Sequence, residues 1–318
     1  MQLTMSAHHV NRFLSQGLTL LLLVNIVGVS SSEQGIHLTI EHEPEGNQPR
    51  QLGRIVNGSQ ALLGQFSHQV SLRYSWMESH FCGGSIIDAQ WILTAAHCMF
   101  LQTGAQIQPW MVSVVAGDLW LNRTSSTSQR RTVAQIIIHE DYNSVTYEND
   151  ITLLRLGEPL IFENSAVQYQ TLQSSTVAAG TKCQVAGWGY PAIDILHLMN
   201  ELMYVEVPIV SQTQCRKLYA EFSDIPDGMI CAGYIEGLRD ACQGDSGGGL
   251  ICGGVLTGVV SSGNGCAWPG FPGIYTDVKH YREWVLRWSG IEERTVGASA
   301  LRSLSTSTAL LLLIAVSL

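Results

Sequence analysis

Three short segments of the sequence carry residues that together could supply a nucleophile, a general base and a group that orients the base. They read LTAAHC at 93–98, ENDI at 148–151 and DACQGDSGG at 240–248, and they contain His97, Asp150 and Ser246. A serine hydroxyl is inert at neutral pH until a base takes its proton, and that base needs a partner that fixes its tautomer. Histidine suits the base role because its pKa is about 6.5. This set of residue types indicates nucleophilic catalysis by serine.

Each of these signals is weak alone, and their combination in the order His, Asp, Ser gives them weight. The chain has 10 histidines, an isolated aspartate more often caps a turn or pairs with a cation, and GDSGG at 244–248 could be an ordinary loop. The glycines beside Ser246 have a chemical use, however. They let the backbone turn sharply and aim two N–H groups at one point, where such a pair can bind the oxyanion of a tetrahedral intermediate.

The stretches between these segments have the pattern of short strands. Apolar and polar residues alternate, or β-branched residues run together, at 69–73, 112–115, 136–138, 151–156 and 258–260. Many short strands separated by turn residues predict an antiparallel β-sandwich or barrel. One helix is expected from Val278 to Trp288, because Tyr281 and Val285 recur with them at helical spacing and Gly290 follows as a stop.

The composition excludes two broad classes of protein. With 46% apolar and 14% charged residues, the chain is too apolar to be intrinsically disordered. It has 17 Lys and Arg against 26 Asp and Glu, a net charge of −9, and no basic run that could follow phosphates, which argues against a nucleic-acid partner. Eight cysteines, an even number, are compatible with four disulfides and an oxidising compartment.

Both ends of the chain have the pattern of targeting segments. Residues 1–32 hold a Leu-rich run at 18–29 followed by small residues, which predicts a secretory signal peptide, with a buried N-terminal helix as the alternative. Residues 33–54 are predicted to be a linker or pro-segment. Residues 291–318 contain small residues, a polar spacer and the apolar stretch 309–318. That order predicts a GPI-anchor signal and membrane attachment through a lipid, with a weakly membrane-active tail on a soluble protein as the alternative.

Together these motifs resemble the chymotrypsin/trypsin family of serine proteases, over residues 55–290. Besides the three segments above, the resemblance rests on RIVNG at 54–58, CGGS at 82–85, WILTAAHC at 91–98 and GWG at 187–189. It implies an all-β fold of two packed antiparallel six-stranded β-barrels with the site in the cleft and a C-terminal α-helix. It also implies a serine endopeptidase, made as a zymogen and secreted or tethered outside the cell, that needs no cofactor and meets protein or peptide substrates and protein protease inhibitors.

By this resemblance Ser246 is the nucleophile, and His97 is the general base and then the general acid. Asp150 orients His97 and stabilises its charged form. The N–H groups of Gly244 and Ser246 form the oxyanion hole. Ser261 is expected to hydrogen-bond Asp150 from the far side.

Substrate preference depends, by the same resemblance, on Asp240, which takes the place of the aspartate at the base of the primary pocket in trypsin-like members. Gly263 and Gly273 line that pocket. A buried carboxylate favours a cationic partner, so cleavage after Arg and Lys is expected; the alternative is an internal pair between Asp240 and Arg239. Ala241 stands where many trypsins have a serine that helps to hold Lys, so we expect Arg to be preferred over Lys.

Activation is expected to follow cleavage after Arg54. The new α-amino group of Ile55 would, by resemblance, pair with Asp245 and so shape the oxyanion hole. No cysteine lies within 33–54, so the pro-segment is expected to leave after cleavage. Because the segment ends in an arginine, we hypothesise that the protease activates itself.

Counting cysteines leaves their pairing open, and the resemblance selects one arrangement. The expected disulfides are Cys82–Cys98, Cys183–Cys252, Cys215–Cys231 and Cys242–Cys266. All eight cysteines are used in it, which leaves no thiol for catalysis or for a metal site.

The polar loop 117–129 lies where trypsins have a calcium loop. Asp118 is a single carboxylate there, so no metal is predicted. Two Asn-X-Ser/Thr sequons occur. Asn122 in this loop is the predicted glycosylation site, whereas Asn57 lies close to the activation bond and is the poorer candidate.

Two residues beside the predicted site depart from the family pattern. Ser262 stands where the family usually has tryptophan at the rim of the substrate cleft, which should weaken selectivity upstream of the scissile bond. Gly249 replaces the usual proline after the nucleophile loop, a change expected to be tolerated.

A second class of function remains open from the sequence. The chain could be a catalytically inactive protease homologue that acts as a binding module or cofactor, and a membrane-anchored adhesion domain is a third alternative. The complete set of His97, Asp150 and Ser246, together with the intact Arg54–Ile55 bond, favours an active enzyme that works through an acyl-enzyme intermediate.

Overall fold

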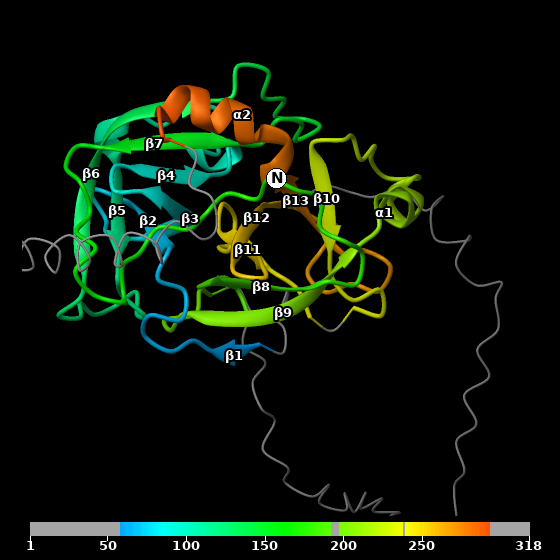
Figure 1. Ribbon diagram of the computed structural model, residues 1–318, viewed down its shortest axis with the longest axis horizontal. Coiled ribbons are helices and arrows are strands. Elements are labelled where there is room, and N and C mark those ends of the chain that lie inside the picture. The colour runs from blue at the N-terminus through cyan, green and yellow to red at the C-terminus, as the bar shows by residue number, and fades with distance from the viewer. Residues whose placement is uncertain (1–57, 192–196, 238, 293–318) are drawn as a thin grey trace, which may run out of the picture. The chain divides into compact units, whose positions relative to one another are not determined.

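A computed structural model describes residues 58–191, 197–237 and 239–292, and strands dominate this part of the chain (Figure 1). The predicted signal peptide and pro-segment lie outside the described residues, as do residues 293–318 of the predicted C-terminal tail, Ile55 and Asn57. Within the described part, no helix is both long enough and apolar enough to span a membrane. All three segments that carry the predicted chemistry are described.

Six strands close into an antiparallel barrel in the first half of the described chain. They are β2 (Gln69–Tyr74), β3 (His80–Asp88), β4 (Trp91–Thr94), β5 (Val112–Ala116), β6 (Gln129–Ile138) and β7 (Thr152–Leu156). Pairing runs from β2 to β3, β4, β7, β6, β5 and back to β2. Aliphatic side chains such as Leu72, Ile92 and Leu154 are fully buried in its core.

A second antiparallel barrel of six strands follows, and the pairing of its first two strands closes the ring. Its strands are β8 (Lys182–Gly187), β9 (Met203–Val210), β10 (Met229–Ala232), β11 (Gly249–Cys252), β12 (Val255–Ser262) and β13 (Gly273–Asp277). The short strand β1 (Ser59–Gln60) adds to β9. In β9, Met203, Val205 and Val207 are buried and the residues between them are half-buried, the period-2 pattern of a strand with one face in a core. The predicted fold of two six-stranded barrels is confirmed.

Helix α2 (Val278–Ser289) lies where the sequence predicts a C-terminal helix. The side chain of Asp277 caps its first turn, and Gly290 ends it in a left-handed conformation with φ of 66°. One position of the predicted apolar face is wrong. Trp288 is 46% exposed, whereas Trp284, at 7%, packs into the core of the first barrel.

The shorter helical segments are not predicted by the sequence pattern. These are α1 (Gln212–Tyr219) and the 3-10 turns η1 (His97–Met99) and η2 (Pro109–Met111). Helix α1 is polar over most of its length, so it lacks the apolar period that reveals α2. Its start did carry a signal, because the Ser211 side chain accepts the N–H of Gln214 as an N-cap.

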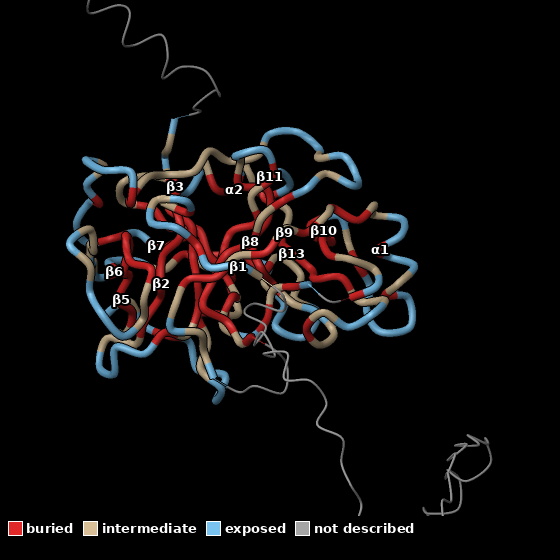
Figure 2. Tube along the Cα trace, turned by 90° about the horizontal axis from the view of Figure 1, so that it is seen from below, coloured by how far each residue is buried: buried red, intermediate tan, exposed pale blue. Residues whose placement is uncertain are grey.

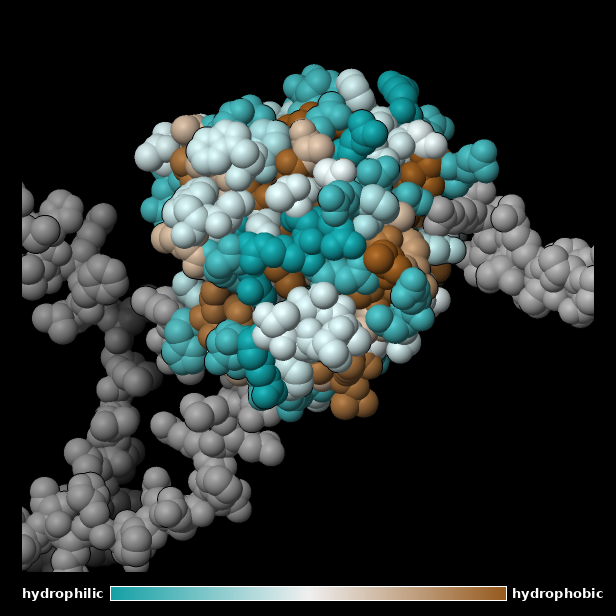
Figure 3. All heavy atoms as spheres, turned by 90° about the vertical axis from the view of Figure 1, so that its left-hand side faces the viewer, coloured by the Kyte–Doolittle hydropathy of each residue, from teal (hydrophilic) through white to brown (hydrophobic). Residues whose placement is uncertain are grey.

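The four predicted disulfides are all present in the structure. They join Cys82 to Cys98, Cys183 to Cys252, Cys215 to Cys231 and Cys242 to Cys266. Figure 2 shows that the buried chain lies along the strands, whereas the connecting loops are largely exposed. Figure 3 faces the side of the first barrel where β5 and β6 lie, and hydrophilic and near-neutral residues there separate small apolar patches.

The strand pairing brings the three chemical segments together. The end of β4 pairs with the start of β7, so His97, just after β4, and Asp150, just before β7, emerge at the same end of the first barrel. Ser246 lies in the loop that leads into β11 of the second barrel. Its carbonyl oxygen accepts the N–H of Gly83 in β3 at 2.8 Å, which joins the two barrels at this point.

Candidate active site

The imidazole of His97 is held by the carboxylate of Asp150, which is fully buried. His97 Nδ1 lies 2.8 Å from Asp150 Oδ2, and the His97 backbone N–H donates to Oδ1 at 2.8 Å. Ser261 donates its hydroxyl to Oδ2 at 2.6 Å, as predicted from the resemblance. Since a carboxylate can only accept, Nδ1 carries the proton and Nε2 is left as the basic nitrogen. The arrangement fixes the tautomer that a general base needs.

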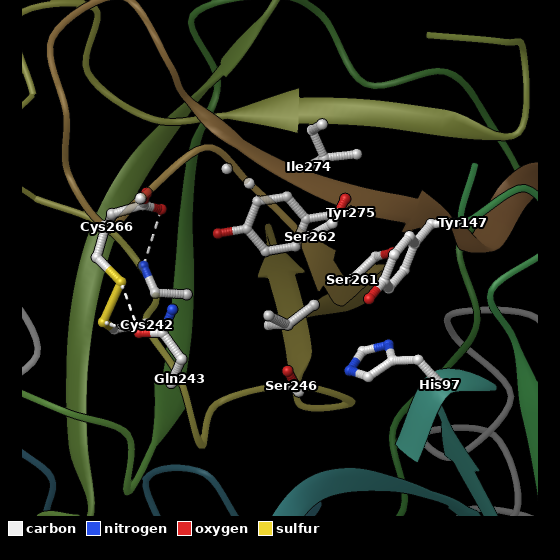
Figure 4. Close-up of a pocket in the computed structure, with 16 residues that line it drawn as sticks. His97, Tyr147, Cys242, Gln243, Ser246, Ser261, Ser262, Cys266, Ile274 and Tyr275 are labelled. Carbon is white, nitrogen blue, oxygen red and sulfur yellow. Dashed lines mark hydrogen bonds between the residues drawn. A yellow bond between two sulfur atoms is a disulfide. The ribbon is translucent and has the colours of Figure 1, made fainter. Parts of the chain in front are cut away.

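His97 and Ser246 line one pocket of about 380 Å³, and both point into it in Figure 4. Among the described residues, the Ser246 hydroxyl forms no hydrogen bond with His97, whose Nε2 lies 3.8 Å from Cys98 Sγ. Such contacts are often loose in substrate-free sites and tighten when substrate binds. The sulfur atoms beside His97 belong to the Cys82–Cys98 disulfide, so this His/Cys cluster has no thiolate to offer a metal.

The backbone around Ser246 leaves two N–H groups available. The N–H groups of Asp245, Gly247 and Gly248 each donate to a backbone carbonyl. In the described part of the chain, those of Gly244 and Ser246 have no protein acceptor. Gly244 has φ of 97°, a conformation that favours glycine. These are the two donors predicted to form the oxyanion hole.

Asp245 is buried under the nucleophile loop and anchors it to the second barrel. Its carboxylate accepts the N–H of Gly189 at 2.8 Å and that of Cys242 at 2.9 Å. Burial raises the pKa of Asp245 to about 6, against these stabilising hydrogen bonds. A side chain at Gly189 would place its Cβ 2.5 Å from the carboxylate, which explains the glycine in the GWG motif.

A buried histidine that sequence analysis missed supports the same loop. His80 Nε2 lies 2.8 Å from the carbonyl oxygen of Gly244, and His80 Nδ1 lies 2.9 Å from Ser71 Oγ. Burial lowers the pKa of His80 to about 4, so the ring is neutral. The Gly244 carbonyl can only accept, which places the proton on Nε2. The sequence does carry an indication that His80 faces inward, since His80 alternates with Cys82 along β3.

Asp240 lines the same pocket and is 3% exposed. It accepts the N–H of Ala241 at 2.9 Å and that of Ala267 at 3.1 Å. Burial raises the pKa of Asp240 to about 7. Arg239, the internal partner considered from the sequence, instead places its guanidinium over the ring of Tyr234 at 5.7 Å, and the described structure contains no ion pair between Asp240 and a cation.

Both glycines predicted to line the pocket do so, but they differ in how much room each leaves for a side chain. A Cβ at Gly273 would lie 2.8 Å from Asp240 Oδ1. A Cβ at Gly263 would meet nothing closer than the Gly265 carbonyl oxygen at 3.6 Å. The first glycine is therefore required by the carboxylate, whereas the second only borders open space.

Of the two departures from the family pattern, the structure explains Gly249 and offers no reason for Ser262. Ser262 lines the pocket without an aromatic ring, and Tyr147, a residue that sequence analysis missed, lies on the His97 side at 5.6 Å between ring centroids (Figure 4). At Gly249, an added Cβ would lie 2.5 Å from Ser85 Oγ. The hydroxyl of Ser85 thus occupies the place that a larger residue at 249 would need.

The loop predicted to carry a glycan is on the surface. Asn122 is exposed, and its backbone N–H donates to Asn200 Oδ1 at 3.0 Å. The carboxylate of Asp118 points back into the loop, where it accepts the N–H of Ser125 at 2.8 Å. The glycan itself stays a prediction.

Comparison with known proteins agrees with this geometry. The family model described as Trypsin matches residues 55–285. The chain is 37% identical to human Trypsin-3 over 232 residues, covering 73% of this chain and 71% of that protein. It is 41% identical to Trypsin delta of Drosophila erecta over 245 residues, covering 77% of this chain and 92% of the relative. A trypsin of Xenopus laevis is 39% identical over 232 residues, with 73% and 89% covered.

Proposed function

This chain belongs to the trypsin family of serine proteases, and we propose that it is an active endopeptidase that cleaves peptide bonds after Arg and Lys. The observation that carries the proposal is the content of one pocket. Ser246, a tautomer-fixed His97 and the carboxylate of Asp240 all line it, and among the described residues no cation pairs with Asp240.

The proposed reaction uses each group in turn. Ser246 Oγ attacks the carbonyl carbon while His97 Nε2 takes its proton, and Asp150 stabilises the imidazolium that forms. The N–H groups of Gly244 and Ser246 bind the oxyanion. His97 then protonates the leaving amine, and water hydrolyses the acyl-enzyme by the same steps in reverse.

Labelling with a fluorophosphonate tests this activity. Protein cleaved after Arg54 should be labelled on Ser246, whereas uncleaved protein and a Ser246→Ala variant should not. If the cleaved wild type stays unlabelled, the chain is an inactive homologue and the enzyme proposal is wrong.

The proposed preference for Arg over Lys depends on Ala241. Asp240 can hold a guanidinium by two parallel hydrogen bonds, whereas an ammonium needs a further acceptor that alanine does not supply. Paired peptides that differ only in Arg or Lys before the scissile bond should give a higher kcat/KM for Arg. Ala241→Ser should narrow that ratio, and an equal or Lys-favouring ratio in the wild type would refute the preference.

The proposed zymogen is activated at the Arg54–Ile55 bond, and the freed α-amino group pairs with Asp245. Asp245 supports this role because it is buried with hydrogen bonds from backbone N–H groups and no cation among the described residues. Self-activation predicts that the Ser246→Ala zymogen stays uncut on incubation alone, while the wild-type zymogen is processed.

We also propose an extracellular location, with the chain cut at the small residues 297–300 and the spacer and apolar tail that follow them replaced by a GPI anchor. Members of this family act on protein substrates and are inhibited by protein inhibitors, and a tethered form would act at the cell surface. Treating intact cells with phosphatidylinositol-specific phospholipase should release the protein into the medium. Retention on the treated cells would exclude this kind of anchor.

A further inference from the structure

We propose that the bond between Arg123 and Thr124 is a self-cleavage site by which one copy of this protease inactivates another, and that a glycan on Asn122 controls the cut. The inference rests on the proposed Arg specificity and names a substrate for it, a second copy of this chain. Hydrolysis adds one water across the bond, leaving a carboxylate on Arg123 and an amine on Thr124.

The Arg123–Thr124 bond lies in the loop between β5 and β6, at an exposed point where these two residues make no hydrogen bond to the rest of the described structure. Asn122, Arg123 and Thr124 are all exposed. On one side the Asn122 N–H is bonded to Asn200, and on the other the Ser125 N–H is bonded to Asp118. Between these anchors, Arg123 and Thr124 make no hydrogen bond in the described structure. Exposed loop points of this kind are the preferred sites of proteolytic nicking.

The other basic residues of the described chain are poorer substrates. All except Arg239 lie within strands or helices, where the backbone is already hydrogen-bonded: Arg73, Arg130, Arg131, Arg155, Lys182, Arg216, Lys217, Lys279, Arg282 and Arg287. Arg239 is followed directly by Asp240, which is buried and held by two backbone N–H groups. Arg123 is thus the one described arginine whose following bond is free to extend into a cleft.

A cut at this bond would separate the catalytic groups without a covalent link between the halves. Cys82–Cys98 lies before the bond, and the other three disulfides lie after it. His97 would belong to the first fragment, and Asp150 and Ser246 to the second. The cut also falls between β5 and β6, which pair in the first barrel, so only non-covalent contacts would hold that barrel closed.

Two features restrain the cut. The Arg123 guanidinium lies 3.5 Å from the centroid of the Trp120 ring, so it must leave a cation–π contact before it can reach Asp240 of another molecule. The second restraint is the sequon itself, because Asn122-Arg123-Thr124 puts the acceptor asparagine next to the scissile residue. A glycan there would be too bulky to enter a cleft built for an extended peptide.

The test follows activated full-length enzyme over time by non-reducing gel, N-terminal sequencing and activity on a small Arg peptide. Asn122→Gln removes the sequon but keeps Arg123, whereas Arg123→Gln keeps the sequon and removes the site. Arg130→Gln, an exposed arginine held in β6, is the matched control. Inert Ser246→Ala chain with and without the Asn122→Gln change, mixed with a trace of active enzyme, tests cutting between molecules.

We expect Asn122→Gln to lose activity severalfold faster than the wild type, with a new N-terminus at Thr124 and two fragments that separate without reduction. Arg123→Gln and the Asn122→Gln/Arg123→Gln double variant should be stable, while Arg130→Gln should behave as the wild type. If Asn122→Gln is poorly secreted, enzymatic removal of the glycan from the wild type replaces it.

The outcomes separate this inference from the proposed function. No initial activity on the Arg peptide refutes the Arg-specific protease itself. Full initial activity with no Thr124 N-terminus, or a decay that Arg123→Gln does not slow, overturns the cleavage site. Equal decay of glycosylated and glycan-free protein overturns the control by the glycan.

Discussion

The raised pKa of Asp240 leads to a pH dependence specific to cationic substrates. In the substrate-free protein, burial raises the pKa of this carboxyl from 3.8 to about 7. The folded protein therefore takes up a proton at Asp240 as the pH falls through 7. Only the ionised carboxylate attracts a guanidinium, so Arg binding should be lost below that pH, while a neutral side chain should be unaffected.

The magnitude follows from the titration. Each pH unit below the pKa lowers the ionised fraction about tenfold. Between pH 8 and pH 5, kcat/KM for an Arg peptide should fall about 100-fold relative to a peptide with a neutral residue at the same position. The ratio matters because kcat/KM reports groups of the free enzyme, and any effect of pH on the catalytic step itself affects both peptides equally and cancels.

The assay measures kcat/KM for the paired Arg and neutral peptides from pH 5 to 8. Asp240→Asn is the control, and its ratio should be low and independent of pH. Thermal stabilisation by benzamidine gives a second readout, since this cation should stabilise the wild type more at pH 8 than at pH 5. A wild-type ratio that stays flat to pH 5 would refute the reasoning, because the carboxylate would then be ionised throughout.

Two further predictions test the geometry of the site. Gly273→Ala should lower kcat/KM for an Arg peptide about tenfold to 100-fold, since overpacking costs about 1–3 kcal/mol and the new methyl group meets Asp240, whereas Gly263→Ala should cost much less; equal losses in the two variants would contradict the structure. Ser261→Ala removes a hydrogen bond to a buried charge, a contact worth about 1.5–3 kcal/mol, so kcat should fall about tenfold or more with little change in KM, and an unchanged kcat would mean that Asp150 is held without it.

The fold and most of the site could be predicted because the relevant signals are local in sequence. The segment around Ser246 specifies a tight glycine-rich turn whatever surrounds it, and short alternating runs specify strands. The pairing of the eight cysteines followed from the resemblance alone, since spacing leaves it open. These features depend on neighbours along the chain or on a motif, so they can be predicted from the sequence alone.

The features that were missed depend on packing between distant segments. His80 supports Gly244 across 164 positions of sequence; its alternation with Cys82 indicates that it faces inward, but no neighbouring residue identifies Gly244 as its partner. Tyr147 lines the pocket and has φ of 59°, a conformation uncommon for tyrosine that its neighbours in the sequence do not predict. Trp284 replaces Trp288 on the core face of α2 because both satisfy the helical period, and only the position of the first barrel decides between them.

Three buried carboxylates at this site share a physical problem, which is that each needs a positive charge. Among the described residues, Asp240 and Asp245 have hydrogen bonds from backbone N–H groups but no cation, and burial raises the pKa of both. In the proposed cycle, the α-amino group of Ile55 would supply the charge for Asp245 at activation, and the substrate Arg would supply it for Asp240 at binding. Asp150 gains a positively charged partner during the reaction, when His97 takes up a proton. Leaving a buried charge unpaired is costly, so each pairing would drive the step in which it forms.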